Sequence, residues 1–532
     1  MKSTIKNWKA SEIAAAVYVF AVVVGLPLVV RNAYYDINVV KYYYYCGASL
    51  LLIPILVLKA REGVSAKGFL ASLSPGEKAL LVFWAVSVLS TLFSKYRFES
   101  FWGNEGRFSG LFLMTIYVAA YFVIARCYRP HPALVYAAVA AGCVTFVIGV
   151  TDFFKLDIFA FKEIIMEEQY DRFISTVGNI NFYTSYAGLI AGAAATVYTL
   201  RSGEDKAKNA LWFGLMTLSF IGMIVGNSDN AYLSLGVVTA FLPLYLFSTR
   251  RAICRYFMML SSLLLSFALY KLCCIRFEGI VQRPQGVNGI IARWDGFFVL
   301  CAVFWAATAA LCAAAWKSRK LEEPISNKVR IVWGIMLVGA AAGVIAVLTD
   351  ANLLGHGERY GALQGFVVFN DDWGTHRGFA WRKALENYGN FPLMQKIFGH
   401  GPDTFGIISY FRDLAESTAM YGELFDSAHN EYLQFLVTIG PIGTAAYMLF
   451  LALSVRDMLK SQGSPYVAAM AFAVSCYCVQ AVVNINQPMS TPIMWTFLAM
   501  GIAEYRRGAL YKKGEEGAET ERKEQNAIGK EN

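Results

Sequence analysis

The chain has 532 residues, of which 57% are apolar, 15% are aromatic and only 16% are charged. Soluble domains carry about 25% charged residues, and a mean hydropathy of +0.45 is too high for a water-soluble fold. These figures exclude a soluble enzyme, a disordered scaffold and a disulfide-stapled secreted protein, and they indicate a polytopic membrane protein.

Fourteen apolar stretches are long enough to cross a bilayer of roughly 30 Å as helices. We therefore predict an all-α membrane protein with about 12–14 transmembrane helices. The first stretch is too long for a signal peptide and has no small-x-small cleavage site, so we interpret it as a retained anchor. The stretches lie at residues 11–30, 41–58, 79–94, 109–125, 132–151, 182–200, 210–226, 230–247, 255–272, 295–315, 331–349, 432–455, 465–486 and 489–504.

Lysine and arginine concentrate in alternate loops. More than half of the 47 basic residues lie in the N-terminus, the C-terminal tail and every second loop, such as Arg250-Arg251 and Lys317-Ser-Arg-Lys320. Basic residues favour the cytoplasmic side of a membrane, so we predict a cell-membrane protein with both termini in the cytoplasm. Topology explains the formal charge of +9, and no nucleic-acid partner is expected.

The longest segment on the other side, about residues 350–430, contains four of the five histidines. We predict an N-terminal transmembrane bundle (1–349), this large extracytoplasmic loop (350–431), C-terminal transmembrane helices (432–504) and a charged cytoplasmic tail (505–532). The span interiors contain almost no ionisable residues, which disfavours a transporter with buried charges at the bilayer midplane. Any chemistry is therefore expected outside the membrane.

The sequence suggests no metal site and no cofactor. The ten cysteines lie inside or beside apolar stretches and form no Cys-x-x-Cys pair, which argues against zinc and against a disulfide framework. Asp371-Asp372 has no obvious third acidic partner, so we interpret it as part of a solvated loop.

A polar loop ends and an apolar helix begins within Ser427-Ala-His-Asn-Glu-Tyr-Leu-Gln-Phe-Leu-Val-Thr-Ile-Gly-Pro-Ile-Gly443. His429 and Asn430 are followed, after nine residues, by Gly440. The segment resembles the signature of the O-antigen ligase and O-antigen polymerase superfamily, and its spacing matches without gaps. The resemblance implies an integral-membrane glycosyltransferase that moves glycans from undecaprenyl diphosphate.

His429 is the residue we expect to act as the catalytic base. The exposed N–H groups and the positive dipole end of the following helix disfavour imidazolium, which would keep the imidazole neutral near pH 7. The alternative is a histidine that only caps the helix at the membrane surface. Asn430 is a candidate for binding substrate, whereas Gly440 and Gly443 are more simply helix-packing positions around a kink at Pro441.

Upstream, the run Arg377-Gly-Phe-Ala-Trp-Arg-Lys-Ala-Leu-Glu-Asn-Tyr388 has the pattern of a helix. At about 100° per residue, Arg377 shares one face with Trp381, Ala384, Leu385 and Tyr388. An arginine on an apolar face is costly unless it meets an anion. The run resembles the family's motif of arginine, three residues and tryptophan, which implies that Arg377 contacts the lipid diphosphate with Trp381 beside it. The alternative is an arginine that extends past Trp381 to the lipid headgroups.

Two further segments match the family more loosely. The run Phe398-Gly-His-Gly-Pro-Asp-Thr-Phe405 resembles its Gly-x-Gly-Pro turn, and we interpret these glycines as turn formers first and glycan contacts second. The run Phe101-Trp-Gly-Asn-Glu-Gly-Arg-Phe-Ser-Gly-Leu111 resembles an outer motif and places Arg107 at a helix entrance, where it could bind substrate.

A third segment, Gly178-Asn-Ile-Asn-Phe182, resembles a Gly-Asn-Pro-Asn-Phe box with isoleucine in place of proline. Asn179 and Asn181 could bind sugar hydroxyls or cap the next helix, and capping is the simpler interpretation.

One departure from the family pattern concerns the lipid diphosphate. Many relatives carry Ser-Arg-Gly between two mid-chain spans, and that arginine also faces the diphosphate. Here the stretch is Asn227-Ser-Asp-Asn-Ala231, with Asp229 in its place. An acidic side chain cannot hold a diphosphate directly, so either Arg107 or Arg293 substitutes for it, or the donor sits differently.

With the resemblance, these residues predict transfer of a glycan from an undecaprenyl-diphosphate donor to an acceptor hydroxyl in surface polysaccharide assembly. Arg377 and Arg107 would stabilise the departing diphosphate, and His429 would deprotonate the acceptor. The expected partners are the lipid-linked glycan, an acceptor glycan or envelope anchor, and the lipid bilayer. The resemblance also implies metal independence, and the ligase-like region is expected over about 215–450.

Two alternatives stay open at this point. A polymerase, a ligase and a protein O-oligosaccharyltransferase share these motifs and differ in the acceptor. A non-enzymatic transporter or flippase of lipid-linked glycans would instead require charged residues along the span interiors.

Overall fold

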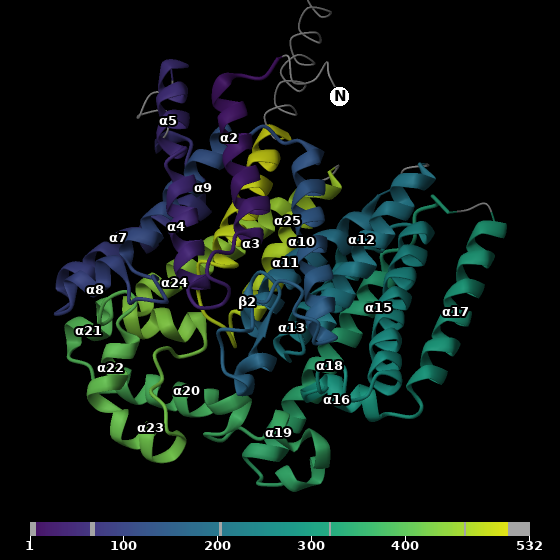
Figure 1. Cartoon of the computed structure of the whole chain (residues 1–532). Helices are drawn as coiled ribbons and strands as arrows, with labels where there is room; N and C mark the ends of the chain where they lie inside the picture. The colour runs from purple at the N-terminus through teal and green to yellow at the C-terminus, as the bar shows by residue number, and fades with distance from the viewer. Residues whose placement is uncertain (1–6, 64–69, 202–204, 319–320, 462–463, 509–532) are drawn as a thin grey trace, which may run out of the picture.

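The computed structural model describes residues 7–63, 70–201, 205–318, 321–461 and 464–508 (Figure 1). In this part of the chain the fold is all-α, apart from an antiparallel hairpin of β1 (Phe173–Ile174) and β2 (Gly178–Asn179). Residues 509–532 of the predicted charged tail and residues 319–320 of a predicted basic loop lie outside the described residues.

Every predicted span coincides with helical structure. Among the described residues, nine helices are long and apolar enough to cross a membrane, and three shorter apolar helices accompany them. The protein is therefore an all-α polytopic membrane protein. The helical segments at the predicted spans are α2 to α3 (Ala10–Leu28), α4 (Ile37–Ser49), α5 (Leu52–Arg61), α7 (Pro75–Phe93), α9 (Leu111–Cys127), α10 (Pro132–Phe153), α11 (Ile180–Leu200), α12 (Lys206–Val225), α13 (Asn230–Gly236), α14 (Leu242–Leu246), α15 (Arg250–Arg276), α17 (Phe297–Lys317), α18 (Lys328–Asn352), α24 (Glu431–Lys460), α25 (Pro465–Gln480) and residues 491–508. Of these, α11 and residues 491–508 are additional to the twelve helices just counted.

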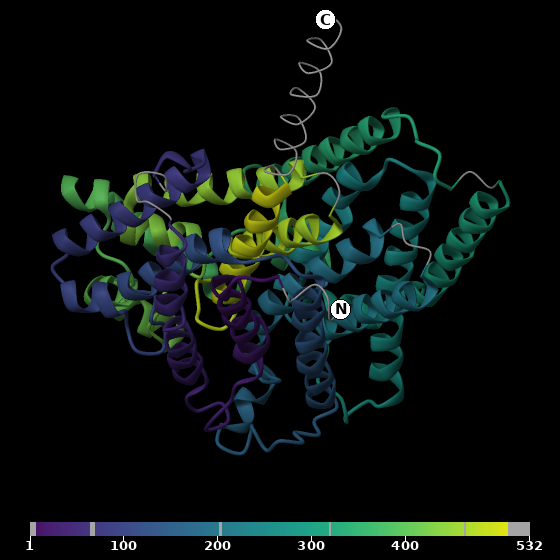
Figure 2. The same cartoon turned by 90° about the horizontal axis from the view of Figure 1, so that it is seen from above.

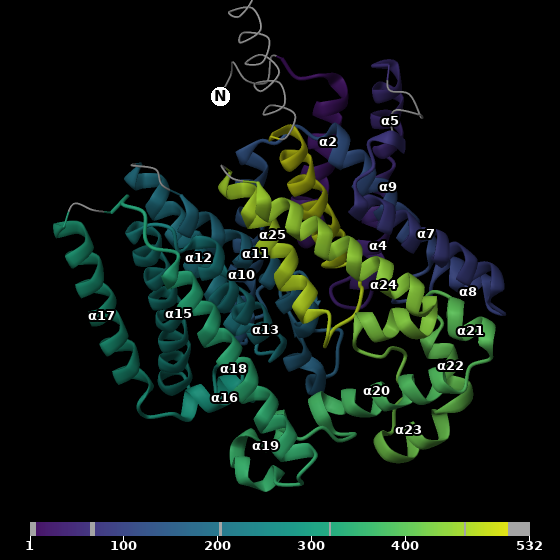
Figure 3. The same cartoon turned by 180° about the vertical axis from the view of Figure 1, so that it is seen from behind.

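Short helices gather at the end of the molecule opposite the N-terminus (Figures 1 and 3). The predicted large loop is thus partly helical, and α21 packs on α7 and α24. These helices are α8 (Arg97–Trp102), α16 (Gly286–Arg293), α19 (Gln364–Val367), α20 (Trp373–Gly389), α21 (Leu393–Phe398), α22 (Phe405–Arg412) and α23 (Leu414–Tyr421).

Ion pairs tie the helix ends on the other side of the bundle. The buried carboxylate of Glu77 pairs with Arg126, at 2.8 Å, and with Arg506. Arg507 pairs with Glu12 at 2.6 Å. The N-terminal ends of α2 and α7, the C-terminal end of α9 and the end of the last described helix therefore meet on one side, as alternate placement of the basic loops requires.

Two buried lysines lie in the candidate spans, each within six residues of a helix end. Lys41 donates to three carbonyl oxygens at the end of α3, at 2.8–3.2 Å. Lys271 does the same at the end of α16, at 2.7–3.4 Å. Each ammonium group satisfies carbonyls that lack helical partners, so these lysines stabilise helix ends and do not form a charged path through the membrane.

Helices α11, α25 and residues 491–508 form the centre of the bundle, whereas α17 and α18 lie at its rim (Figure 2). Helices in lipid approach each other closely where small residues line the contact. A Cβ atom on Gly192 of α11 would lie 2.9 Å from Sγ of Cys476 and 3.2 Å from Cα of Ala473, both in α25. Glycine is therefore required at this contact.

Helix α24 is broken, where the sequence predicts only a kink at Pro441. Gly440 has φ +84° and ψ 172°, which interrupts the helix before the proline. A Cβ atom on Gly440 would lie 2.2 Å from the carbonyl oxygen of Ile397. Both the backbone conformation and the close approach exclude other residues, so α24 consists of a short outer part, Glu431 to Ile439, and a longer spanning part.

The 399–401 turn fills the break. Backbone N–H groups of His400 and Gly401 donate to the carbonyl oxygens of Val437 (3.0 Å) and Thr438 (2.9 Å). Gly401 has φ +126°, which agrees with the predicted role of these glycines as turn formers. The large loop is thus hydrogen-bonded to the broken spanning helix.

We predict that Gly192→Val destabilises the protein by about 1–3 kcal/mol, the usual cost of overpacking a tight contact. Thermal unfolding of the purified protein in detergent measures the effect. Gly339→Val in α18 is the matched control, because a Cβ atom there meets nothing within 4 Å. Equal melting temperatures for the two variants would contradict this account of the α11–α25 contact.

Candidate active site

His429 lies one residue before the N-cap of α24 and does not cap the helix. Asn430 is the N-cap, since its side-chain oxygen accepts the N–H of Leu433 at 3.0 Å. His429 precedes the cap, with φ +48°, in the left-handed region. The alternative that His429 only caps the helix therefore does not fit, and Asn430, predicted to bind substrate, performs that structural task.

Three charged side chains act on His429. Burial lowers the pKa of His429, and the positive charges of Arg107 and Arg377 lower it further. The negative charge of Asp426 acts in the opposite direction. These effects favour the neutral imidazole. The sequence predicts this preference from the helix dipole, whereas here burial contributes most and the two arginines follow.

Arg107 is held by Asp426, three residues before His429. The guanidinium Nε lies 2.9 Å from Oδ2 of Asp426, and Nη2 bonds to Oδ1, so the pair is bidentate. The Arg107 side chain is 17% exposed and that of Asp426 is 52% exposed. Bidentate pairing of this kind fixes orientation as well as charge.

Asp403 positions the loop that carries Arg107. Its Oδ2 accepts the backbone N–H groups of Asn104 (2.8 Å) and Ser109 (3.0 Å), on either side of Arg107. Burial raises the pKa of Asp403 to about 7, while these two hydrogen bonds lower it. Asp403 follows the 399–401 turn directly, so the break in α24 and the Arg107 loop are joined through one short segment.

Arg377 begins the regular part of α20. Gly374, Thr375 and His376 all have positive φ, so the helix assigned from Trp373 is irregular until Arg377. This agrees with the predicted start of the helix. Three successive left-handed residues turn the chain sharply and direct Arg377 back toward the bundle.

The guanidinium of Arg377 donates through Nε to the carbonyl oxygen of Val483 at 3.0 Å, and through Nη1 to that of Gly374. Among the described residues it forms no ion pair within 4.0 Å. Burial lowers the pKa of Arg377, and the charge of Asp229 opposes this. Arg377 is thus a partly desolvated cation without a directly bound counter-ion.

The predicted apolar face of α20 is only partly correct. Leu385 is 56% exposed, whereas Phe379, Ala380 and Ala384 are buried. Trp381 packs against Trp373, with ring centroids 5.2 Å apart. The buried face is therefore rotated away from Leu385, because the outer end of α24 and the segment before it cover the side of α20 that carries Phe379 and Ala384.

The solvent-facing side of α20 carries a cluster of ion pairs around Arg382. Arg382 binds Asp371 through two bonds of 2.9 and 2.7 Å and also contacts Glu386 and Glu416. Arg382 therefore has acidic partners, in contrast to Arg377.

The asparagines of the predicted sugar-binding box serve structural contacts. Asn179 caps α11 by accepting the N–H of Asn181 at 2.9 Å. The side-chain oxygen of Asn181 accepts from Ser228 at 2.8 Å and from Asn230 at 3.1 Å. Asn181 thereby links the box to the stretch that contains Asp229.

Asp229 contacts the N-terminal end of α16, and Arg293 is the last residue at its other end. Asp229 accepts the N–H of Val287 at 2.9 Å and so binds the N-terminus of this helix. Arg293 lies at its exposed C-terminal end. The cations that act on His429 are Arg107 and Arg377.

A polar segment that the sequence analysis missed lies at the centre of these contacts. Helix α25 ends at Gln480, whereas the predicted span ran to residue 486; residues 481–490 are not helical. The carbonyl of Val483 binds Arg377, Asn484 donates to Asn181 at 3.0 Å, and the carbonyl of Asn486 accepts from Ser109. The polar run between two apolar stretches was the signal available in the sequence.

A small cavity of about 20 Å³ adjoins this segment, with room for about one water molecule. Polar side chains predominate in its lining. Ser427, next to the motif, is 2% exposed, and its hydroxyl finds no partner among the described residues. The cavity is lined by Arg107, Ser109, Met114, Asp403, Ser427, Glu431, Gln434, Phe435, Thr438, Ile485 and Asn486.

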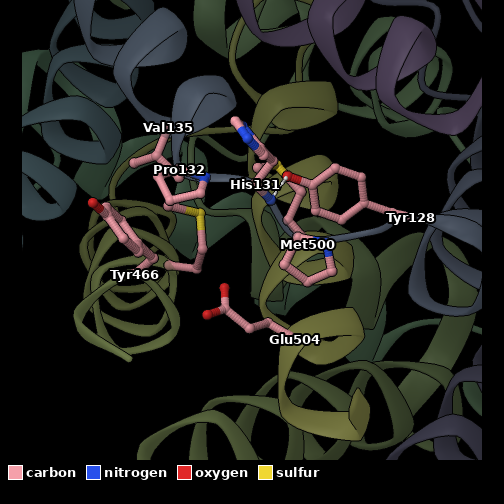
Figure 4. A pocket seen from close by; sticks show the side chains of 9 residues that line it. Tyr128, His131, Pro132, Val135, Tyr466, Met500 and Glu504 are labelled. Carbon is pink, nitrogen blue, oxygen red and sulfur yellow. Dashed lines mark hydrogen bonds between the residues drawn. The ribbon is translucent and has the colours of Figure 1, made fainter. Parts of the chain in front are cut away.

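Another cavity, of about 60 Å³, lies on the side of the ion-paired helix ends (Figure 4). His131 caps α10 there and donates its backbone N–H to the hydroxyl of Tyr128 at 3.3 Å. Glu504 faces it from the last described helix. None of the predicted site residues lines this cavity, and His131 has a structural role.

Residues 298–448 match the family model described as O-antigen ligase. The matched region begins in α17 and ends within α24, so it contains Arg377, Asp426 and His429. Arg107 and the polar 481–487 segment lie outside it. A comparison with characterised proteins gives no match. Among the described residues, no group of three His, Cys, Asp or Glu side chains is placed to hold a metal ion.

Proposed function

We propose that this chain, whose residues 298–448 match the O-antigen ligase family model, transfers a glycan from undecaprenyl diphosphate to an acceptor hydroxyl. The observation that carries the proposal is the convergence of Arg107, Arg377 and His429. These residues come from three separate segments of the chain, and the charges of Arg107 and Arg377 both act on His429.

The chemistry needs a cationic site and a base. The bond between the anomeric carbon and the diphosphate oxygen breaks, and its electron pair leaves with the diphosphate. Arg377, without a directly bound counter-ion, supplies positive charge for the departing oxygens, and Arg107 adds a second cation. His429 accepts the proton of the acceptor hydroxyl, for which a neutral imidazole is required. No step uses a metal ion.

The acceptor is an hydroxyl of another glycan or of an envelope anchor, which corresponds to polymerase or ligase activity. Transfer to a protein hydroxyl would use the same three side chains. A flippase is disfavoured because the charged residues of the described spans lie near helix ends, where they pair or cap.

We place the reaction at the extracytoplasmic face. The loops rich in lysine and arginine lie on the other side of the bundle, and basic loops favour the cytoplasm. The 350–431 loop would then cover a site open to the outer leaflet, where the diphosphate of the donor lies at headgroup depth.

This topology predicts that Glu423→Cys is labelled in intact cells by a membrane-impermeant thiol reagent, whereas Lys208→Cys is labelled only after the cells are opened. Both native side chains are exposed. The unsubstituted chain, with its ten cysteines, provides the background. The reverse pattern would overturn the orientation and every role assigned to the large loop.

Arg377→Lys is expected to abolish most glycan transfer while leaving expression and folding intact, because lysine keeps the charge but loses the planar fork that binds phosphate oxygens in pairs. Transfer from an undecaprenyl-diphosphate glycan by the purified protein is the assay. Arg382→Lys is the matched control, since Arg382 binds carboxylates on the loop surface. An active Arg377→Lys together with an inactive Arg382→Lys would mean that the wrong face of α20 has been chosen.

His429→Asn should fold and bind the lipid-linked donor, yet lose about 10²–10⁴-fold in transfer rate, the usual cost of removing a general base. Asparagine tolerates the left-handed conformation of this position, so the backbone is preserved. His356→Ala, in the same loop, should have little effect. A transfer rate within a few-fold of wild type for His429→Asn would show that another group accepts the proton.

A further inference from the structure

The carboxylate of Asp426 interacts electrostatically with both Arg107 and His429, but of these two described residues it forms hydrogen bonds only with Arg107. Its carboxylate holds Arg107 through both oxygens, although its side chain is half exposed. It also acts on the imidazole of His429, three residues along the chain. The same carboxylate is therefore available to the candidate cation and to the candidate base.

The charged groups that face His429 come from separate elements. Arg107 lies in the loop before α9, Arg377 lies in α20, and Asp426 lies in the segment before α24. Asp403, from the segment after the 399–401 turn, acts on Asp426 and carries the loop of Arg107. Asp426 is the one acidic group among those that act on the imidazole.

A diphosphate and Asp426 compete for the same guanidinium. A bidentate carboxylate uses the donors of an arginine fork that a phosphate would also use. Exposure of the Asp426 side chain leaves it free to turn, whereas Arg107 is largely buried and is anchored by the loop around it. When an anion binds the guanidinium of Arg107, the side chain that moves away is therefore Asp426.

We propose that Asp426 is a positioning residue that passes from Arg107 to His429 when the diphosphate of the donor binds. This inference rests on the proposed function. In the unliganded protein, Asp426 neutralises Arg107, and His429 faces cations. In the donor complex, the diphosphate neutralises Arg107, and Asp426 accepts a hydrogen bond from one ring nitrogen of His429.

This movement of Asp426 from Arg107 to His429, the handover, brings together all the groups that the transfer needs, and no further reagent is required. The other ring nitrogen of His429 takes the proton of the acceptor hydroxyl, the acceptor oxygen forms a bond to the anomeric carbon, and the bond to the diphosphate oxygen breaks with its electron pair. Asp426 then faces an imidazolium and stabilises it, and the proton leaves to solvent after transfer. His429 is thus a weak base until the donor is in place.

The test is the steady-state kinetics of Asp426→Asn with an undecaprenyl-diphosphate glycan in nanodiscs. We expect kcat to fall by about 10²-fold, the lower range for losing effective base catalysis, while KM for the donor stays equal or decreases, because Arg107 no longer has a charged competitor. Asp426→Glu should recover part of kcat. Asp371→Asn is the matched control, since Asp371 forms an equivalent bidentate pair with Arg382 and has no such relation to His429.

A kcat for Asp426→Asn within about three-fold of wild type would overturn the proposal. So would a rise in donor KM with unchanged kcat, because Asp426 would then only hold Arg107 in place.

Histidine-labelled protein gives a second readout, since the chain has only five histidines. Addition of undecaprenyl diphosphate should raise the pKa of His429 by NMR in the wild type, and clearly less in Asp426→Asn. An equal rise in both proteins refutes the handover but leaves the proposed function intact. Failure of undecaprenyl diphosphate to bind the wild type refutes the proposed function itself.

Discussion

The hydrogen bonds between the 399–401 turn and the broken part of α24 connect the whole outer face. Gly440 and Pro441 together leave the carbonyls of Val437 and Thr438 without their helical donors, and a buried carbonyl without a partner is costly. The turn supplies the missing donors, and Asp403, two residues beyond it, binds the loop of Arg107 from both sides. Arg107 in turn contacts the segment that leads into α24 next to His429. These contacts form a closed circuit that runs from α24 through the turn, Asp403 and Arg107 back to the start of α24. The break in α24 therefore determines where Arg107 lies relative to His429.

Five of the eleven described non-glycine residues with left-handed backbone conformations lie on the outer face, near the candidate site. Phe108, Thr375, His376, Asp403 and His429 all have positive φ, which costs of order 1–3 kcal/mol per residue unless the surroundings enforce it. They lie in the segments that carry the candidate site. The membrane bundle, with its close glycine contacts, is the rigid part against which these segments are held. Such conformations direct side chains toward one another in ways that a regular helix or strand does not allow.

Hydropathy predicted the location of every spanning helix, because the bilayer imposes length and composition on each one. Boundaries depended on tertiary contacts: the span predicted at 465–486 ends at Gln480, where buried polar backbone and side chains bind the outer segments instead of lipid. The face of α20 was partly wrong for the same reason, since Leu385 has nothing to pack against. Asp403 and Asp426 were missed because their importance arises from partners about 300 residues away, and no local pattern in the chain marks such a pairing.

Asp229 stands where the resemblance to the O-antigen ligase superfamily implies an arginine. Asp229 binds the N-terminus of α16, and its negative charge acts on Arg377. On the proposed function, an aspartate there in place of an arginine lowers the positive charge available to the diphosphate, and Arg107 supplies the second cation. On the proposed handover, Arg107 is occupied until Asp426 leaves it, and part of the binding energy of the donor is used to separate this pair. Energy used in that way weakens binding of the donor but prepares the base, and the same contacts then contribute to the transition state rather than to the ground state.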